Sequence, residues 1–480
     1  MVEKTMQPSI AVSLQAAVEG QPKAGLTASF RFAPQQPEVG QPGKVPGDVL
    51  LVTGSDGGHT VLVSLGPAEK CSAEAVRRAG GGLGKWLISQ KISQIDLDLD
   101  SLEESGVENA AEALCEGIRL GSYQFTRLKK QDEPVVEPVA VLRGGKNPAQ
   151  NEAVVRRVNA VTGAVIMARD LAHEPANVIN PITLAERAQE IAEKYGLKIK
   201  VLDDKTLADM GAGAIVAVGK GSQTPSRLIV LEYDGGAADQ QPIALVGKAI
   251  TFDTGGYSLK GSENITGMKY DKCGGAAVLG VMQAAAELQL KTRLVGVIGA
   301  AENMISGYAY RPDDILTSLS GKTNEIITTD AEGRLVLADA LTYAQREYSP
   351  KAVIDFATLT GGVFVALGHV RAGLLSNDDE LANALFASGE RTFERLWRLP
   401  LDEEFSKQIK GDDADIKNSG GRGGHCILGG AFLKEFIEDG TPWAHIDIAG
   451  TAGTQTDLPY APKGATGFGV RLLIDYLESL

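Results

Sequence analysis

The stretch "ALVGKAITFDTGGYSLK", residues 244–260, decides the fold class of this chain. Apolar and β-branched residues flank Lys248, and Gly255 and Gly256 then supply a turn, which is the pattern of a central strand in an α/β sheet. A charged group inside such a strand costs several kcal/mol unless another group pairs with it. Lys248 and Asp253 therefore predict that partners for their charges lie beside this strand.

Length and composition bound the class of protein. A chain of 480 residues is too long for one ordinary domain, so two domains are expected. Hydrophobic residues make up 43% of the chain, aromatic residues only 5%, and 57 residues are glycine, which is typical of an α/β protein with many tight turns. The formal net charge of −14 argues against a general nucleic-acid binder, because that class needs a basic face.

The cellular location is predicted from three features. No stretch is apolar over a length that could cross a membrane, and "MVEKTMQPSIAVSLQ" lacks the basic segment and the apolar segment of a secretory signal. The four cysteines, Cys71, Cys115, Cys273 and Cys426, form no CxxC pair and are expected as reduced thiols. These features predict a cytoplasmic protein with no membrane partner.

The first part of the chain reads as a small α/β domain, because short apolar strands alternate with helices. The predicted elements are strands at residues 9–15, 48–54, 59–66 and 94–99, and helices from about residue 72 and over residues 107–121. Residues 131–150 are rich in proline, glycine and charge and indicate a break. We expect an N-terminal domain over residues 1–149, a linking helix over 150–172 and a second domain over 173–480.

The glycine-rich stretch "GGGLGKW", residues 80–86, faintly resembles a phosphate loop. The phosphate-loop spacing would need glycine where Ala79 stands and serine or threonine where Trp86 stands. We therefore do not expect nucleotide binding there.

The second part of the chain continues the alternation with longer elements. Strands are predicted at residues 227–233, 243–252, 292–303, 352–361 and 445–452, with helices between them, notably over 273–289 and 333–347. This order predicts a mixed, mostly parallel central sheet. In an open sheet of this kind ligands bind at the carboxyl ends of the strands, and the polar residues that interrupt these strands fall at those ends. The sequence therefore predicts one crevice.

Acidic and basic side chains gather at the predicted strand ends. They are Lys248, Asp253, Lys260, Asp271, Asp330, Glu332 and Arg334. Asp330 and Glu332 stand two residues apart just before a helix, so both can face one point, and the helix N-terminus favours negative charge. Four carboxylates at one point would repel one another strongly, and a pair of divalent cations would remove that repulsion.

Each of these residues also has a structural alternative when it is taken alone. Asp271 could cap the following helix, Glu332 and Arg334 could form an ion pair, and Lys248 could be an interior lysine with satisfied hydrogen bonds. Together, these alternatives need several independent coincidences at adjacent strand ends. The chain has five histidines, with no HExxH motif, so the metal site would be dominated by carboxylates, which suit Zn, Mn or Mg.

Three motifs, "VGKAITFDTGGYSLK", "MKYDKCGGAA" and especially "TTDAEGRL", resemble those of the leucyl aminopeptidase (cytosol aminopeptidase) family of two-metal exopeptidases. The resemblance runs from about Ala168 to the C-terminus and includes "ATLTGG" and "WAHIDIAGTA". The N-terminal domain matches in size and α/β character, and the resemblance implies a macro-like domain there. It also implies an enzyme that releases N-terminal leucine and similar apolar residues from peptides with a free N-terminus.

The resemblance implies two divalent ions per subunit, Mn²⁺ or Zn²⁺. Asp253 and Glu332 would bridge them, Lys248 and Asp271 would complete the tighter site, and Asp330 would complete the exchangeable site through its carboxylate and its backbone carbonyl. Lys248 would bind as the neutral amine, so it would lose the proton that an unperturbed lysine holds up to a pKa of about 10.4.

The resemblance gives Lys260 and Arg334 catalytic roles. Lys260 would remain charged and stabilise the oxyanion of the tetrahedral intermediate formed when water attacks the scissile carbonyl. Arg334 would hold a bicarbonate ion that relays a proton from the water to the leaving amine.

The resemblance also implies a substrate pocket lined by small or apolar residues, as a leucine-sized side chain requires. The pocket residues are Met268, Thr328, Ala331, Thr358, Gly361, Ala449 and Ala452. Three positions depart from the family pattern: Thr328 stands where asparagine is usual, Lys272 where methionine is common, and Thr254 where serine is frequent. Thr328 bears on the preference for the second residue, and Lys272 on the charge near the metals.

The resemblance implies a homohexamer, a dimer of trimers.

Two other classes of function remain open on the residues. A di-metal phosphoesterase also uses carboxylate clusters, but its sites usually include histidines, which this crevice lacks. A non-catalytic assembly or DNA-binding protein on the same fold would have no need of Lys260 or Arg334.

Overall fold

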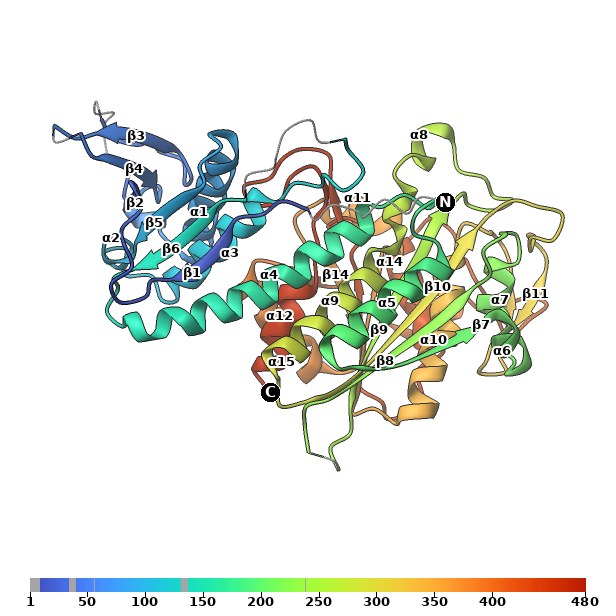
Figure 1. The fold of residues 1–480 in the computed structure, drawn as a ribbon. Coiled ribbons are helices and arrows are strands. Elements are labelled where there is room, and N and C mark those ends of the chain that lie inside the picture. The colour runs from blue at the N-terminus through green and yellow to red at the C-terminus, as the bar shows by residue number, and fades with distance from the viewer. Residues whose placement is uncertain (1–8, 34–39, 56, 131–136, 238) are drawn as a thin grey trace. The chain divides into compact units, whose positions relative to one another are not determined.

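The computed structural model describes residues 9–33, 40–55, 57–130, 137–237 and 239–480 (Figure 1). The chain forms two compact units, residues 1–166 with 454–464, and residues 167–453 with 465–480. Both units contain a sheet with helices, and the sheet of the larger unit is mixed and mostly parallel. The predicted fold class, a small N-terminal α/β domain followed by a larger α/β domain, is confirmed.

The N-terminal unit contains a six-stranded sheet with the order β1-β6-β5-β2-β4-β3. Its strands are β1 (Ser13–Ala16), β2 (Leu26–Arg31), β3 (Val49–Thr53), β4 (His59–Ser64), β5 (Gln94–Asp98) and β6 (Val139–Arg143), and its helices are α1 (Ala73–Ser89), α2 (Leu99–Glu103) and α3 (Ala110–Ser122), with short 3₁₀ turns at Ala68–Lys70 and Pro148–Gln150. Neighbouring strands run parallel except for β3 and β4.

The break predicted over residues 131–150 is wrong at residues 139–143, because these residues form the strand β6. This strand pairs with β1 on one side and with β5 on the other, so it belongs to the interior of the sheet. Its four apolar residues stand between Pro138 and Gly144, and the composition of these flanks concealed a short strand from the sequence pattern. Residues 131–136 lie outside the described part of the chain. The strand β2 was also absent from the prediction.

The stretch "GGGLGKW" is helical and lies inside α1, so it forms no phosphate loop. A Cβ atom on Gly80 would overlap the carbonyl oxygen of Leu114 on α3, and one on Gly121 would lie 2.6 Å from the Cα of Gly81. These distances are shorter than any normal carbon contact. The glycines therefore serve to bring the backbones of α1 and α3 together.

The larger unit is built on an eight-stranded sheet with the order β15-β14-β17-β13-β9-β10-β8-β7. Its strands are β7 (Lys198–Asp203), β8 (Arg227–Asp234), β9 (Ile243–Asp253), β10 (Arg293–Asn303), β13 (Ala352–Ala357), β14 (Ala372–Ser376), β15 (Leu396–Arg398) and β17 (Trp443–Asp447), and short strands elsewhere are β11 (Ile315–Thr317), β12 (Thr323–Glu325), β16 (Ile416–Lys417), β18 (Gly453–Thr454) and β19 (Gly464–Ala465). The four central strands β17, β13, β9 and β10 run parallel, so their carboxyl ends share one edge.

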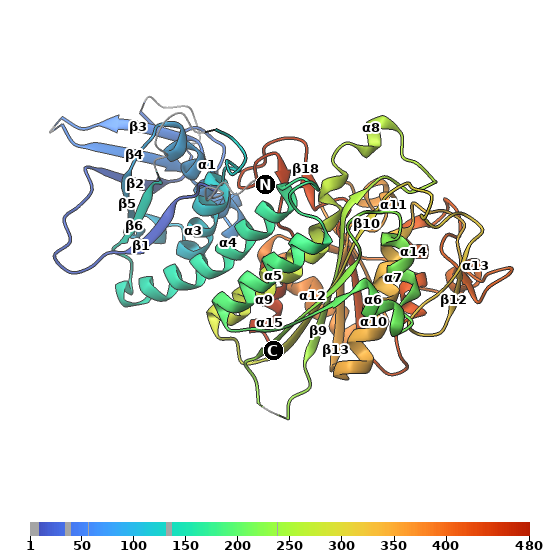
Figure 2. The ribbon, with the colours of Figure 1, turned by 45° about the vertical axis from the view of Figure 1, so that its right-hand side comes forward.

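Helices cover both faces of this sheet, as Figures 1 and 2 show. The helices of the larger unit are α5 (Pro181–Tyr195), α6 (Asp204–Asp209), α7 (Gly213–Gly219), α8 (Ser262–Ile265), the 3₁₀ helix η3 (Met268–Lys272), α9 (Cys273–Leu288), α10 (Glu332–Tyr348), α11 (Gly361–Leu367), α12 (Asp379–Thr392), α13 (Glu403–Gln408), α14 (His425–Lys434) and α15 (Val470–Glu478). On one face α9 packs against α5 and α15, and on the other α10 packs against α7 and α14. The core beneath α10 joins side chains of β9, β10 and β13.

Two of the predicted strands end earlier than expected, and both ends matter for the site. The strand predicted over residues 352–361 ends at Ala357, because Thr360 caps α11 by accepting a hydrogen bond from the backbone of Val363. The strand predicted over 445–452 ends at Asp447. The segments that follow both ends leave the sheet at its carboxyl edge.

A long helix, α4 (Asn151–His173), carries the chain from one unit to the other. The linking helix was predicted over residues 150–172, and the division between the units by contacts falls inside α4, after residue 166. Residues 454–464 group with the N-terminal unit by the same criterion. Among the described residues, no helix combines the length and the apolar character that a membrane crossing requires.

Replacing Gly117 with alanine should destabilise the N-terminal unit, because the new methyl group would overlap the carbonyl oxygen of Arg77 on α1. We expect the free energy of unfolding to fall by about 1–3 kcal/mol, the usual cost of overpacking. Gly163→Ala in α4 is the matched control, since its added methyl would meet no atom within 4 Å. That change should stabilise by roughly 0.5–1 kcal/mol. Urea denaturation measures both, and equal effects would contradict this account of the α1–α3 contact.

Candidate metal centre

The site begins at the carboxyl end of β9, where every residue of the strand except the half-buried Phe252 is buried, including the last one, Asp253. The neighbouring strand β10 ends at Asn303, and the pairing of the two strands shifts register just before Asn303 meets Asp253. This irregularity aims the amide of Asn303 into the site, where its Nδ2 donates to Asp253 Oδ1 at 2.8 Å and to the carbonyl oxygen of Thr329 at 3.0 Å. The backbone N–H of Gly255 also donates to Asp253 Oδ1.

Lys248 lies in the middle of β9 and is almost completely buried. Its Nζ is 2.9 Å from Asp271 Oδ1 and 2.9 Å from Glu332 Oε1, and it donates to the carbonyl oxygen of Thr358 at 3.0 Å. Burial opposes a charge here, but the carboxylates of Asp271, Glu332 and Asp253 outweigh it and raise the pKa of Lys248. The partners that the sequence predicts for this buried lysine are therefore present.

Asp271 does not serve as the helix cap that the sequence left open as an alternative. The N-cap of α9 is Lys272, and no side chain caps that helix end. The carboxylate of Asp271 instead accepts from the hydroxyl of Thr358 at 2.7 Å and pairs with Lys248. Burial raises the pKa of Asp271 to about 7.

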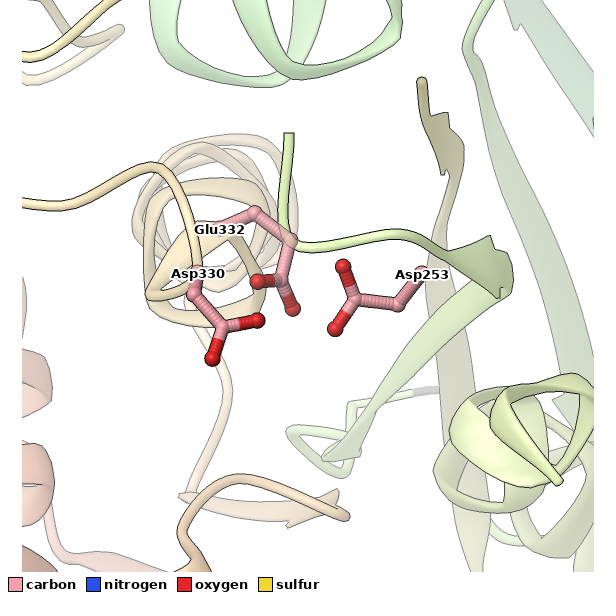
Figure 3. A group of neighbouring side chains, drawn as sticks. All are labelled: Asp253, Asp330 and Glu332. Atoms are coloured by element: carbon pink, nitrogen blue, oxygen red, sulfur yellow. The ribbon is translucent and has the colours of Figure 1, made fainter. Parts of the chain in front are cut away.

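Three carboxylates meet beside Lys260. Asp253, Asp330 and Glu332 each offer an oxygen atom within 4.8 Å of the others, and Figure 3 shows the three groups turned toward one another. Lys260 Nζ is 2.8 Å from Asp253 Oδ2 and also pairs with Asp330. These carboxylates raise the pKa of Lys260 in spite of its burial.

The electrostatics of the cluster favour cations. Burial raises the pKa of Asp330 to about 6, and burial together with the charge of Glu332 raises that of Asp253. Glu332 is buried, but Lys248 and Lys260 lower its pKa. Glu332 Oε2 and Asp271 Oδ2 are buried oxygen atoms that have no hydrogen-bond partner among the described residues. Such atoms are rare in native proteins and fit a site whose missing partners are metal ions.

Arg334 lies two residues after Glu332 in the first turn of α10 and is buried. Its Nη1 donates to the carbonyl oxygen of Asn418 at 2.7 Å, and its Nε has no hydrogen-bond partner in the part of the chain that the structure describes. Burial lowers the pKa of Arg334 to about 10. The alternative that Arg334 is the counter-ion of Glu332 predicts an ion pair between them, and in the described part of the chain none joins these two residues.

The seven predicted pocket residues lie on segments at this edge of the larger sheet. Met268 is on η3, Thr358 and Gly361 follow β13, and Ala449 and Ala452 follow β17, whereas Thr328 and Ala331 precede α10. The structure connects two of these directly to the cluster. Thr358 binds Lys248 and Asp271 as described, and the hydroxyl of Thr328 accepts from the backbone N–H of Asp330 at 3.2 Å.

Several polar residues of the site were missed by the sequence analysis. Asn303 orients Asp253, and Asn418 accepts from the backbone N–H groups of Ile327 and Thr328 through its side chain. Asp447 accepts from the backbone N–H of Leu359 at 3.1 Å and so holds the segment that follows β13. An asparagine or aspartate in a strand end or loop has no periodic signal, so only the structure could reveal them.

His425 is a further side chain at this edge that the sequence analysis did not select. His425 begins α14 and lies close to α11. A Cβ atom added to Gly362 of α11 would lie 3.0 Å from the Cβ atom of His425. Burial and the charge of Arg334 lower its pKa. Within the sequence it belongs to none of the recognised motifs.

The fold and the site together define an α/β protein with a carboxylate cluster that could hold metal ions. The sequence pattern of the cytosol aminopeptidase family matches twice, through its catalytic domain over residues 166–474 and through its N-terminal domain over residues 45–132. The chain belongs to the cytosol aminopeptidase family. The predicted family is therefore confirmed.

Individual relatives agree with this assignment. A probable cytosol aminopeptidase of Syntrophotalea carbinolica is 46% identical over 444 residues, which cover 91% of this chain and 89% of the relative. A probable cytosol aminopeptidase of Rickettsia felis is 43% identical over 88% of this chain and 85% of its own. Among solved structures, the bottromycin maturation enzyme BotP in complex with Mn superposes with a TM-score of 0.87 at 34% identity, covering 95% of this chain and 99% of BotP.

Asn303→Ala should destabilise the larger unit, because it removes both hydrogen bonds of a fully buried amide and one of the two donors to Asp253 Oδ1. Hydrogen bonds to charged groups contribute about 1.5–3 kcal/mol, so we expect a loss of that size in the free energy of unfolding. Asn264→Ala, at an exposed position, should change it by less than about 0.5 kcal/mol. Urea denaturation of both variants makes the comparison, and a neutral Asn303→Ala would contradict the orienting role.

Proposed function

We propose that this protein is a two-metal aminopeptidase that releases N-terminal leucine and similar apolar residues from peptides with a free N-terminus. The observation that carries the proposal is the group of Asp253, Asp330 and Glu332, each of which offers one oxygen atom within 4.8 Å of the others, beside the buried Lys248 and the partly buried Lys260. Membership of the cytosol aminopeptidase family supports the reaction type.

Five residues would hold two divalent ions, Mn²⁺ or Zn²⁺. Asp253 and Glu332 would bridge them, Lys248 and Asp271 would complete the tighter site, and Asp330 would complete the exchangeable one. The unpartnered buried oxygens of Glu332 and Asp271 fit this assignment, and a related structure, BotP, contains Mn. When bound, the ions would polarise the scissile carbonyl and lower the pKa of the attacking water.

Lys248 would be a ligand only after losing a proton. Its amine lone pair is occupied by that proton while Lys248 pairs with Asp271 and Glu332. The charges of Asp271 and Glu332 hold that proton, so Lys248 would release it where these two carboxylates served as metal ligands.

Lys260 and Arg334 would act on the reaction itself. Lys260 is partly buried among carboxylates that keep it protonated, so its Nζ can donate to the oxyanion of the tetrahedral intermediate. The buried Nε of Arg334 has no partner within the described ranges, which fits an anion such as bicarbonate that would relay a proton to the leaving amine.

The substrate would lie between the cluster and the segments that follow β13 and β17. The side chain of its first residue would occupy the pocket of Met268, Thr358, Gly361, Ala449 and Ala452, and its free α-amine would bind the exchangeable metal. Thr328 and Ala331 would lie beside the second residue. The direct contacts of Thr358 with Lys248 and Asp271 support this placement.

We further propose a cytoplasmic homohexamer with no membrane partner and no general affinity for nucleic acid. The net charge of −14 supports the last point. Exposed apolar side chains on and after α11, namely Phe364, Val365 and Val370, support self-association, because such groups commonly mark contact surfaces.

A substrate panel tests the reaction type. Leucine amide and dipeptides that begin with leucine should be cleaved, whereas N-acetyl-leucine amide should not, because acetylation removes the lone pair of the α-amine and adds bulk where the pocket ends. Thorough chelation should abolish cleavage, and Mn²⁺ or Zn²⁺ should restore it. Cleavage of a phosphate ester alone would identify a phosphoesterase, and no cleavage at all would identify a binding protein. Hydrolysis of the acetylated amide at a comparable rate would exclude an aminopeptidase of this type.

Lys260→Ala should lower kcat by about 10²-fold or more, because one donor to the oxyanion is lost. The variant should still fold and bind metal, which metal analysis and circular dichroism would establish. Lys291→Ala, at an exposed lysine, is the control and should leave kcat unchanged. An unchanged kcat with a raised KM would instead assign Lys260 to binding of the ground state.

A further inference from the structure

The short helix η3 carries two residues of the proposed site within five positions. Met268 begins it and Asp271 is its fourth residue. The remaining large side chains, Lys269, Tyr270 and Lys272, contact residues 172–174, where α4 ends. We call these contacts the α4–η3 clamp.

Lys272 makes the most buried contact of the clamp, since only 1% of its surface is exposed. Its Nζ donates to the carbonyl oxygens of Glu174 at 2.8 Å and Ala172 at 3.3 Å. It also donates to the carbonyl oxygen of Lys269 at 2.5 Å, within η3 itself. One ammonium group therefore binds the end of α4 and the first turn of η3 at the same time.

Lys269 and Tyr270 contact His173, the residue between Ala172 and Glu174. Lys269 Nζ donates to the carbonyl oxygen of His173 at 2.7 Å, and the ring of Tyr270 meets that of His173 edge-on with centroids 5.6 Å apart. His173 Nε2 accepts from the backbone N–H of Ala465, so its proton is on Nδ1, which donates to Tyr270 Oη at 3.3 Å. Burial lowers the pKa of His173 to about 4, which keeps this neutral form in place near neutral pH.

The end of α4 is a suitable anchor for physical reasons. The last carbonyl groups of a helix have no partner within the helix and carry the negative end of its dipole, so cations bind there favourably. A buried ammonium group without acceptors would cost several kcal/mol. The two lysines of η3 and the carbonyl groups of residues 172–174 therefore satisfy each other, and η3 is fixed where it meets the helix.

The side chains of Lys272, in the clamp, and of Asp271, the proposed ligand, leave η3 in different directions. Successive side chains of a 3₁₀ helix are about 120° apart. Lys272 binds α4, whereas Asp271 next to it reaches Lys248 at 2.9 Å and the hydroxyl of Thr358 at 2.7 Å. Fixing the backbone at Lys272 therefore also fixes the direction from which the Asp271 carboxylate enters the cluster.

We propose that Lys272 is a positioning residue for the metal ligand Asp271 and that it acts through the α4–η3 clamp. This inference rests on the proposed two-metal function. It adds that the clamp serves only one of the two metal sites, because Asp271 would belong to the tighter site, whereas Asp330 approaches from the segment before α10. Residues that orient metal ligands typically contribute a factor of about 10–100 in metal affinity.

The test compares Mn²⁺ binding to the wild-type protein and to Lys272→Met by isothermal titration calorimetry. Methionine keeps the unbranched stem and loses the three N–H donors. We expect the dissociation constant of the tighter site to rise by about 10–100-fold, and that of the exchangeable site to stay unchanged. Lys322→Met is the matched control, because Lys322 Nζ also donates to a carbonyl oxygen near a helix end, that of Glu435 at 2.6 Å. It should leave both constants unchanged.

The other possible outcomes of the titration decide between the positioning role and the two-metal function. Unchanged affinity in Lys272→Met, or equal weakening of both sites, would overturn the positioning role while leaving the two-metal proposal intact. A wild-type protein that binds no pair of Mn²⁺ ions would overturn the two-metal function and the clamp with it. If Lys272→Met fails to fold, Tyr270→Phe removes only one hydroxyl from the clamp. Tyr270→Phe should weaken Mn²⁺ binding at the tighter site alone. If this variant binds Mn²⁺ at both sites with the affinity of the wild-type protein, the proposal is overturned.

Discussion

The buried ion pairs of Lys248 with Asp271 and Glu332 are the interaction on which the rest of the larger unit depends. A lysine in the central strand of a sheet needs both partners and room, and neighbouring glycines provide the room. A Cβ on Gly333 would lie 2.6 Å from Lys248 Nζ, and one on Gly247 would lie 2.7 Å from the Cα of Gly275. The glycine of the "DAEGRL" motif is thus required because the lysine side chain occupies the space that any larger residue would fill.

The same close approach determines how the ligands reach the cluster. Gly247 lies on β9 and Gly275 on the first turn of α9, so α9 packs directly on the strand and brings the preceding η3 to the carboxyl edge of the sheet. Glu332 begins α10 on the other face, where its charge lies at a helix N-terminus. The charged residues therefore project from a strand, a 3₁₀ turn and a helix start, and each of these backbones is fixed by packing rather than by the ligands themselves.

Sequence reasoning succeeded where a pattern is long or chemically improbable by chance. The strands β9 and β10 and the helices α9 and α10 have long apolar runs, and a lysine and an aspartate inside such a run identified the site. It failed for β2 and β6, which are short and flanked by proline or glycine, so their signal is no stronger than that of a loop. Asn303 and the partners of Lys272 escaped for another reason. Their roles arise from contacts between segments far apart in the chain, such as Lys272 with residues 172–174, and no local pattern records such contacts.

The charges of the cluster explain why two lysines would have different fates in the proposed enzyme. Asp253, Asp271, Asp330 and Glu332 outnumber the two ammonium groups, and with all four carboxyl groups ionised two negative charges would be unbalanced, which favours the entry of cations. Two divalent ions would bring four positive charges against that excess of two, so the loss of a proton from one of the ammonium groups would become more favourable. Lys248 is enclosed in β9 and cannot leave, and its carboxylate partners are the ones that the metals would take. Lys260 follows a turn at the rim and keeps contact with Asp330 at the exposed side, so it can stay charged where an oxyanion would form. The burial of one lysine and the partial exposure of the other therefore agree with the proposed roles, Lys248 as the neutral ligand and Lys260 as the cationic catalyst, within one set of carboxylates.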